Sequence, residues 1–222
     1  VLGGAAAIAA LQAAAGDPDP EVRYTAWRAM ADCGAPPSLA SLLAEVDKAG
    51  LQPSTRLADL IRRVVADQPR AAEAAALRGA HGPQTRALLV DAIGGAGDYA
   101  ALPTLIEAAG DPDPDVRAAA VRALGRLQHP ISEPAIRAAL ADDDWPVQLA
   151  GAEAAGAAGL AALTPELVAL LGHPEWWVRF RAGEALGRLG AAGLLALRKA
   201  QAEHDELVRS AAARALAEAV AA

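Results

Sequence analysis

The amino-acid sequence predicts an all-α fold, a right-handed superhelical solenoid of about seven helix-turn-helix units, and three observations support this. A similar phrase stands twice in the chain, GDPDPEVRYTAWRAMADCG from Gly16 and GDPDPDVRAAAVRALG from Gly110. The Val-Arg pair inside that phrase recurs about every 31 residues, a period typical of stacked repeats. Alanine, leucine, arginine and glutamate are abundant and aromatic residues make up only 3% of the chain, a composition that favours helix over strand.

The recurring pair divides the chain into units, and we expect a single domain over residues 1–222 because the period runs through all of it. Arginine follows the anchor residue everywhere except at Gln148. In the second unit the apolar residues are shifted against the anchor, which predicts an altered turn over residues 50–54. The anchor pairs are Val22-Arg23, Thr55-Arg56, Thr85-Arg86, Val116-Arg117, Val147-Gln148, Val178-Arg179 and Val208-Arg209. The expected units are 1–34, 35–66, 67–97, 98–128, 129–159, 160–190 and 191–222.

The unit 98–128 shows how each repeat is expected to fold, with a first helix over Asp98–Gly110 and a second over Pro114–Leu127. Between them the Asp-Pro pairs turn the chain and Asp113 caps the second helix, whose first turn tolerates Pro114 because that N–H would have no partner. Apolar residues then recur at helical spacing and predict a buried face. The residues expected in the core are Val116, Ala119, Ala120, Ala123, Leu124 and Leu127, their counterparts Val178, Ala182, Ala185, Leu186 and Leu189, and Cys33, which aligns with Leu127.

The repeated unit, DPDPDVRAAAVRALGRL from Asp111 and HPEWWVRFRAGEALGRLG from His173, resembles the short HEAT repeat of the phycobilin-lyase type over essentially the whole chain. The resemblance implies a superhelix with its first helices on the convex side and its second helices along the concave side. Each arginine after an anchor is expected to pair with loop aspartates and so to link neighbouring units. This expected structural ladder comprises Arg23, Arg86, Arg117, Arg179 and Arg209 with Asp111 and Asp113.

The sequence predicts no catalytic site, no metal site and no cofactor. His81, His129, His173 and His204 each lie in or beside a predicted loop or helix end, and none is expected to form a metal pair on a helix. No serine or threonine lies beside a histidine to form a nucleophile triad. The acidic run at 142–144 lacks the rest of a calcium loop and aligns with the DPDP turn of other units. We therefore expect no enzyme activity.

The candidate site is a surface on the second helices, where positions equivalent to Asp115, Ala118 and Arg122 are expected to oppose the buried set. Aromatic residues are scarce, yet they gather in this region, and tryptophan, tyrosine and arginine dominate the energetics of interfaces. Trp145 and Trp176 hold equivalent positions in adjacent units, so their rings are expected to meet. The candidate partner-binding residues are Trp177, Phe180, Arg181, Glu184, Trp145, Trp176 and Leu149, with Tyr24, Trp27 and Arg28 as a smaller patch.

These features predict a non-catalytic scaffold that binds another protein through its concave face. Two alternatives stay open: a nucleic-acid-binding HEAT-like protein, and a chaperone-like lyase subunit of the phycobilin type, the latter suggested by resemblance alone. A net charge of −7 and a pI near 5.1 provide no positive field for nucleic acid, so specific nucleic-acid binding is not expected.

The first residues, VLGGAAAIAALQAAA, form an apolar stretch that is shorter than the roughly 20 residues of a spanning helix. We therefore expect no membrane insertion of the residues in this sequence, although a membrane anchor upstream would be consistent with them. The expected location is cytoplasmic, with the soluble domain of a membrane-anchored bacterial protein as the alternative.

Overall fold

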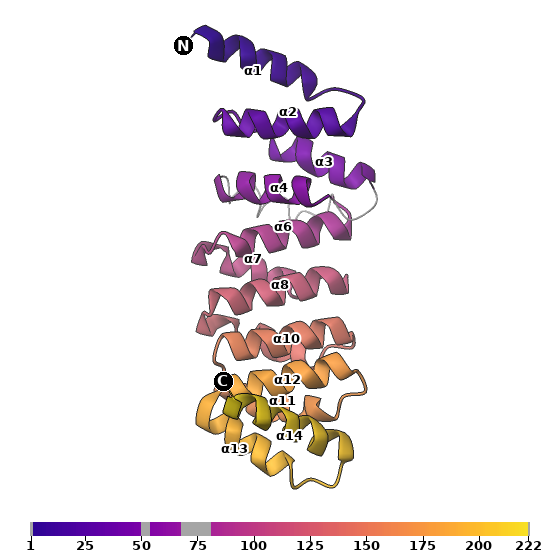
Figure 1. The fold of residues 1–222 in the computed structure, drawn as a ribbon, viewed down its shortest axis with the longest axis vertical. Helices are drawn as coiled ribbons and strands as arrows, with labels where there is room; N and C mark the ends of the chain where they lie inside the picture. The colour runs from indigo at the N-terminus through magenta and orange to yellow at the C-terminus, as the bar shows by residue number, and fades with distance from the viewer. Residues whose placement is uncertain (1, 50–53, 68–80, 222) are drawn as a thin grey trace.

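The chain folds into a solenoid of stacked α-helices, of which the computed structural model describes residues 2–49, 54–67 and 81–221. These ranges contain no strand, and the predicted all-α solenoid is confirmed. Figure 1 shows the helices stacked along one long axis, from the N-terminal helix at one end to the C-terminal pair at the other. The altered turn predicted over 50–54 falls almost entirely outside the described residues.

In every unit but that of α6 the described residues include a first helix and a second helix, and neighbouring second helices pack on one another along the stack. We call the surface that they form the second-helix face. The second helices are α2 (Pro20–Asp32), α4 (Thr55–Asp67), α6 (Pro83–Gly95), α8 (Pro114–Leu127), α10 (Trp145–Ala157), α12 (Trp176–Arg188) and α14 (Glu206–Ala221). The first helices are α1 (Leu2–Ala14), α3 (Leu39–Ala49), α7 (Leu102–Ala108), α9 (Glu133–Leu140), α11 (Thr164–Ala169) and α13 (Gly190–Ala200), with the 3₁₀ turns η1 (Tyr99–Ala101), η2 (Pro130–Ser132), η3 (Ala161–Leu163) and η4 (Leu170–Gly172).

The GDPDP phrase forms the turn that the sequence predicts. The side chain of Asp113 accepts a hydrogen bond of 3.0 Å from the backbone N–H of Asp115, and α8 begins at Pro114. The predicted first helix of this unit is split, because it starts as the 3₁₀ turn η1 and continues as α7. Pro103 explains the split, since it lacks the N–H that an α-helix begun at Asp98 would require.

Adjacent second helices approach each other closely at glycines. A Cβ atom on Gly125 of α8 would lie 2.6 Å from Cα of Ala154 on α10, and one on Gly156 would lie 2.8 Å from Cα of Ala185 on α12. A side chain at these positions would push the second helices apart. The glycines therefore shorten the second-helix side of the stack, which favours curvature toward that side, as expected for a concave surface.

The core follows the predicted pattern in the middle of the stack and departs from it at the first unit. All six residues expected in the core of α8 are buried, whereas Leu189 is half-buried because it caps the C-terminus of α12. Cys33 was expected in the core but is exposed. It is the cap that follows α2, whereas Leu127 lies inside α8. The anchor Val22 is also 39% exposed.

The buried face of a second helix is wider than the periodicity predicts. Ala118 was expected to oppose the core, yet it is only 3% exposed. Its counterparts Tyr24, Leu149 and Phe180 are half-buried. The reason is that a second helix inside the stack is covered by its own first helix and by the second helices before and after it, as α8 is by α7, α6 and α10.

Candidate protein-binding surface

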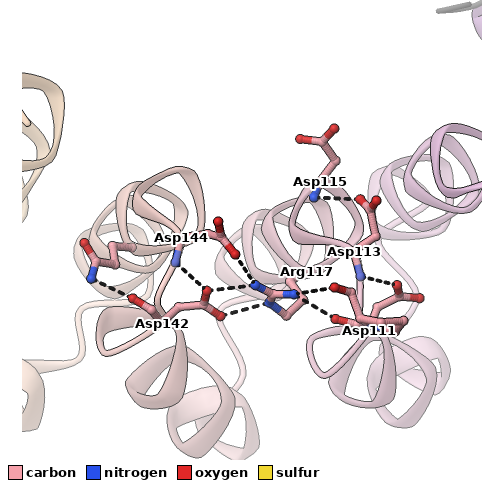
Figure 2. A network of polar contacts seen from close by, with 8 residues as sticks. Asp111, Asp113, Asp115, Arg117, Asp142 and Asp144 are labelled. Atoms are coloured by element: carbon pink, nitrogen blue, oxygen red, sulfur yellow. Dashed lines mark hydrogen bonds and ion pairs between the residues drawn. The ribbon is translucent and has the colours of Figure 1, made fainter.

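The repeated arginines connect the turns of successive units, as Arg117 illustrates. Its Nε and Nη2 donate to the two carboxylate oxygens of Asp142 at 2.9 and 2.8 Å, and Nη2 also donates to Asp144 at 2.9 Å (Figure 2). Its Nη1 donates to the carbonyls of Asp111 and Pro112 at 3.0 and 3.1 Å. The guanidinium thus joins the turn of its own unit to the turn of the next. Only 14% of the Arg117 side chain is exposed.

Arg86 makes the same connection one unit earlier, with Nε and Nη2 donating to Asp111 at 3.0 and 2.8 Å. Burial alone would raise the pKa of Asp111. The hydrogen bonds from Arg86 and from the backbone N–H of Asp113 outweigh that effect and hold the pKa below its ordinary value of 3.8. The pKa of Asp142 is lowered in the same way, with burial opposed by the hydrogen bonds from Arg117 and from Asp144.

The other arginines of the expected ladder also donate to backbone carbonyls of their own turn, and they differ in whether they pair with a carboxylate of the next unit. Arg23 donates to the carbonyls of Asp17 and Pro18 and pairs with Glu45 of α3. Arg179 and Arg209 each donate to two turn carbonyls, and neither has an ion pair with a residue of the described ranges. At Gln148 the amide nitrogen donates to the carbonyl of Asp142 at 2.7 Å. Asp113 caps α8 and accepts no hydrogen bond from an arginine of the series.

A compact polar cluster connects α3 to α6. Asp47 accepts a hydrogen bond of 2.7 Å from the buried hydroxyl of Thr85, and its second oxygen lies 2.7 Å from Nδ1 of His81. Burial would raise the pKa of Asp47, but the hydrogen bonds from His81, Thr85 and the N–H of Gly82 lower it overall. Because Thr85 donates to the carboxylate and not to the imidazole, this cluster has no activated nucleophile. Among the residues described, no three His, Cys, Asp or Glu side chains gather in a way that could hold a metal ion.

The first turns of α12 carry a partly exposed group of rings, which we call the aromatic cluster: Trp176, Trp177 and Phe180. Trp176 stacks on Phe180 with centroids 5.1 Å apart, and Trp177 meets Trp176 edge to face at 4.6 Å. Trp176 and Trp177 are 48% and 53% exposed. Arg214 of α14 completes the cluster, with its guanidinium carbon 4.3 Å from the Phe180 centroid, within the range of a cation–π contact.

Two expectations about aromatic residues are wrong. Trp27 is 5% exposed and belongs to the core, where Tyr24 contacts it with centroids 5.7 Å apart. Only Tyr24 and the exposed Arg28 of that patch reach the surface, at a cleft of about 500 Å³ between α2 and α4. Trp145 is 42% exposed, and no described ring contacts it. Trp176 stacks on Phe180, one turn later in the same helix, instead of on Trp145 of the neighbouring unit as expected.

Beside the aromatic cluster lies a shallow cleft of about 260 Å³ across α8, α10 and α12, which we call the arginine cleft. The cleft adjoins a second groove of about 420 Å³ that crosses α4, α6 and α8, since Arg122 lines both hollows. Small residues lie between its charged side chains. The residues lining the arginine cleft are Arg122, Gly125, Arg126, Glu153, Ala154, Ala157, Arg181 and Arg188.

Ion pairs occupy most of the charged groups in the arginine cleft. Arg181 pairs with Glu153 at 2.8 Å and with Glu184 at 2.6 Å. The hydrogen bond to Glu184 raises the pKa of Arg181, although partial burial opposes this. Arg188 also pairs with Glu184, at 3.1 Å, so the sequence-predicted residues Arg181 and Glu184 form one network.

The remaining arginines of the cleft differ from one another. Arg126 donates to Asp91 at 3.1 Å. Arg122 is exposed and has no hydrogen bond or ion pair with any residue in the part of the chain that the structure describes. Neither arginine was among the predicted site residues, and nor was Arg214. The sequence could have identified Arg122 and Arg214, because both align in the repeat with the predicted site residue Glu184.

Comparisons with known proteins give one family and several similar folds. A family model for HEAT repeats matches residues 71–155 and 132–217. The chain is similar to a structure of the complex of CpcE and CpcF of phycocyanin lyase from Nostoc sp. PCC7120, with 24% identity over 98% of this chain and 80% of that chain and a TM-score of 0.48. It is also similar to a designed armadillo repeat protein in complex with the peptide (KR)4, with 20% identity over 96% of this chain and 97% of that chain and a TM-score of 0.42.

A third similar structure is human deoxyhypusine hydroxylase in complex with glycerol, with 18% identity over 100% of this chain and 99% of that chain and a TM-score of 0.39. No curated protein matches the chain at a significant level. None of the helices in the described ranges has the length and apolar character needed to cross a bilayer.

Proposed function

This chain belongs to the family of HEAT-repeat proteins, and on that premise we propose that it is a non-catalytic scaffold that binds another protein through its second-helix face. The observation that carries the proposal is the aromatic cluster. Trp177 and Phe180 stand on α12 at positions where α8 has Asp115 and Ala118, so the repeat fold does not require large side chains there. Large rings left in water forgo a stabilisation of about 2 kcal/mol each, which a partner surface would recover.

The chemistry of the surface also fits a protein partner. Apolar rings sit next to a network of arginines and carboxylates, and interfaces combine an aromatic centre with a polar rim in this way. The mixed signs of Arg181, Glu153 and Glu184 do not fit the strongly basic groove that a nucleic-acid backbone needs. The polar clusters described above lack an activated nucleophile, which supports a binding role over catalysis.

The test uses the protein as bait in an extract of the source cells. The double variant Trp177→Ala/Phe180→Ala is compared with wild type and with the control Tyr99→Ala/Ile131→Ala. The control removes one ring and one aliphatic side chain, which are 60% and 57% exposed and belong to η1 and η2 away from the second-helix face. We expect a partner that wild type and the control retain and the double variant loses.

Calorimetry with the captured partner then measures the effect. We expect the double variant to bind more weakly by over ~2 kcal/mol, which is roughly thirtyfold in Kd. Trp177→Ala alone should leave the melting temperature nearly unchanged, because the ring is 53% exposed. Equal binding by the double variant and wild type, or a large loss of melting temperature in Trp177→Ala, would exclude this surface as the binding site.

A further inference from the structure

We propose that the partner segment bound by the second-helix face is acidic, with a carboxylate that pairs with Arg122 while an apolar side chain further along the same segment packs on the aromatic cluster. This inference rests on the proposed function and names the chemistry of the partner. It starts from Arg122, which lines both the arginine cleft and the groove beside it and has no partner in the described ranges.

The charge balance of the arginine cleft singles out this residue. Glu153 is the carboxylate among the residues that line the cleft, and it faces Arg181. Two further carboxylates pair with arginines of the cleft, Asp91 with Arg126 and Glu184 with Arg181. Arg188 shares Glu184. Four arginines line the cleft, and one of their three carboxylate partners, Asp91, is shared with Arg62 at 3.5 Å, so the unmatched charge is positive on a chain whose net charge is −7. A carboxylate can bind Arg122 directly, whereas a basic segment would first have to break existing ion pairs.

The shape of the cleft allows a polypeptide to reach this charge. Between the arginines its floor consists of small residues, Gly125, Ala154 and Ala157. Gly125 and Ala154 pack against each other, since a Cβ on the glycine would lie 2.7 Å from Cβ of the alanine. The floor is therefore closed and flat, and a segment can lie across it with its side chains directed to the arginines on either side.

The cleft and the aromatic cluster adjoin at Arg181, so one segment that crosses this residue can contact both. Arg181 lines the cleft, and its guanidinium carbon lies 5.5 Å from the centroid of Phe180. A segment with an acidic residue over Arg122 and an apolar residue further toward α12 would meet complementary chemistry at both points. A polyanion is less suitable, because phosphates in series would face Glu153 and Glu184 as well.

The experiment selects ligands without assuming a partner. Phage displaying random linear peptides are selected on the intact wild-type chain, and the enriched peptides are sequenced and synthesised with a fluorescein label. Fluorescence anisotropy then gives Kd for wild type, Arg122→Gln, Arg122→Glu, Trp177→Ala and the control Arg198→Glu. The control makes the same change of net charge at an exposed residue of α13. A fluorescein-labelled DNA duplex is titrated in parallel.

We expect enriched peptides with a net negative charge and an apolar residue. Arg122→Gln should raise Kd about fivefold and Arg122→Glu about thirtyfold, while Arg198→Glu should change it less than twofold. Neutral or basic peptides, no enrichment, tighter binding of the duplex than of the peptides, or equal Kd values for Arg122→Glu and Arg198→Glu would each overturn the inference. Peptides that depend on Trp177 but not on Arg122 would refute the inference and leave the proposed function standing. Peptides that depend on Arg122 but not on Trp177 would refute both, because the proposed function and the inference each place an apolar contact on the aromatic cluster.

Discussion

Replacing Gly125 with alanine tests whether the close approach of second helices holds the solenoid together. Gly125 is buried in α8, and a Cβ atom there would lie 2.6 Å from Cα and 2.7 Å from Cβ of Ala154. Ordinary contacts begin at 3.4 Å, so α8 and α10 would have to separate by most of an ångström. Neither atom belongs to a flexible side chain that could rotate away, and the strain therefore falls on the packing of two helices.

Two opposing effects set the magnitude. Alanine is favoured over glycine inside a helix by about 1 kcal/mol. Overpacking typically costs about 1 to 3 kcal/mol, and the rigid neighbour places this site near the upper end. We therefore expect Gly125→Ala to lower the free energy of unfolding by about 2 kcal/mol, although helix propensity alone predicts a gain.

The matched control is Gly95→Ala at the end of α6, where no atom lies within 4 Å of the added Cβ. This variant should be unchanged or more stable by up to about 1 kcal/mol. Urea unfolding followed by circular dichroism measures both variants. With a slope of about 2 kcal/mol per molar urea, the midpoint of Gly125→Ala should fall by about 1 M.

Hydrogen exchange adds a local readout, because repeat arrays can open unit by unit. Protection should fall in α8 and α10 of Gly125→Ala and stay near the wild-type level in α2. A midpoint for Gly125→Ala equal to or above that of Gly95→Ala would show that the helices separate freely, and the reasoning about close packing and curvature would then be wrong.

Two further predictions concern the polar contacts between turns. The pKa values of Asp47, Asp111 and Asp142 are lower in the folded chain than their ordinary value of 3.8. The stability that these carboxylates contribute to the fold is therefore complete above that pH and is lost as the pH falls below it. The urea midpoint should drop steeply below about pH 4, and less steeply in Asp142→Asn, while parallel profiles would contradict this assignment. Gln148→Arg with His173→Asp should recreate the pairing of Arg117 with Asp142 and stabilise the double variant by about 1 kcal/mol more than the two single changes together. Additive changes in the urea midpoint would count against it.

The local structure that short-range chemistry determines was predicted well from the sequence. The bounds of α8, Pro114–Leu127, agree with those expected, because a capping aspartate and a proline determine where the helix begins. The partners of Arg86 and Arg117 are turn aspartates, as expected, since the repeat places the next turn within reach of each guanidinium. These features depend on residues within one unit or its immediate neighbour.

Features that depend on how helices surround one another were predicted less well. Trp27 aligns with Val121, which is fully buried, and this alignment was the signal that its ring belongs to the core. The burial of Ala118 and the stacking of Arg214 on Phe180 depend on the distance between second helices, which one-dimensional periodicity does not contain. The same holds for the glycines of α8 and α10, whose role appears only when the neighbouring alanines are in place.

The residues that hold the solenoid together and the residues proposed to bind a partner occupy different positions of the repeat. Gly125 and Arg117 are buried or largely covered and act between units. Trp177 and Arg122 stand at exposed positions of single helices, where the corresponding residues of other units differ in size and charge. Binding and stability should therefore separate: changes at Trp177 or Arg122 alter affinity with little effect on unfolding, and changes at Gly125 or Arg117 alter unfolding first. That separation lets a loss of binding in a surface variant be read as a loss of contact, because the fold beneath it remains intact.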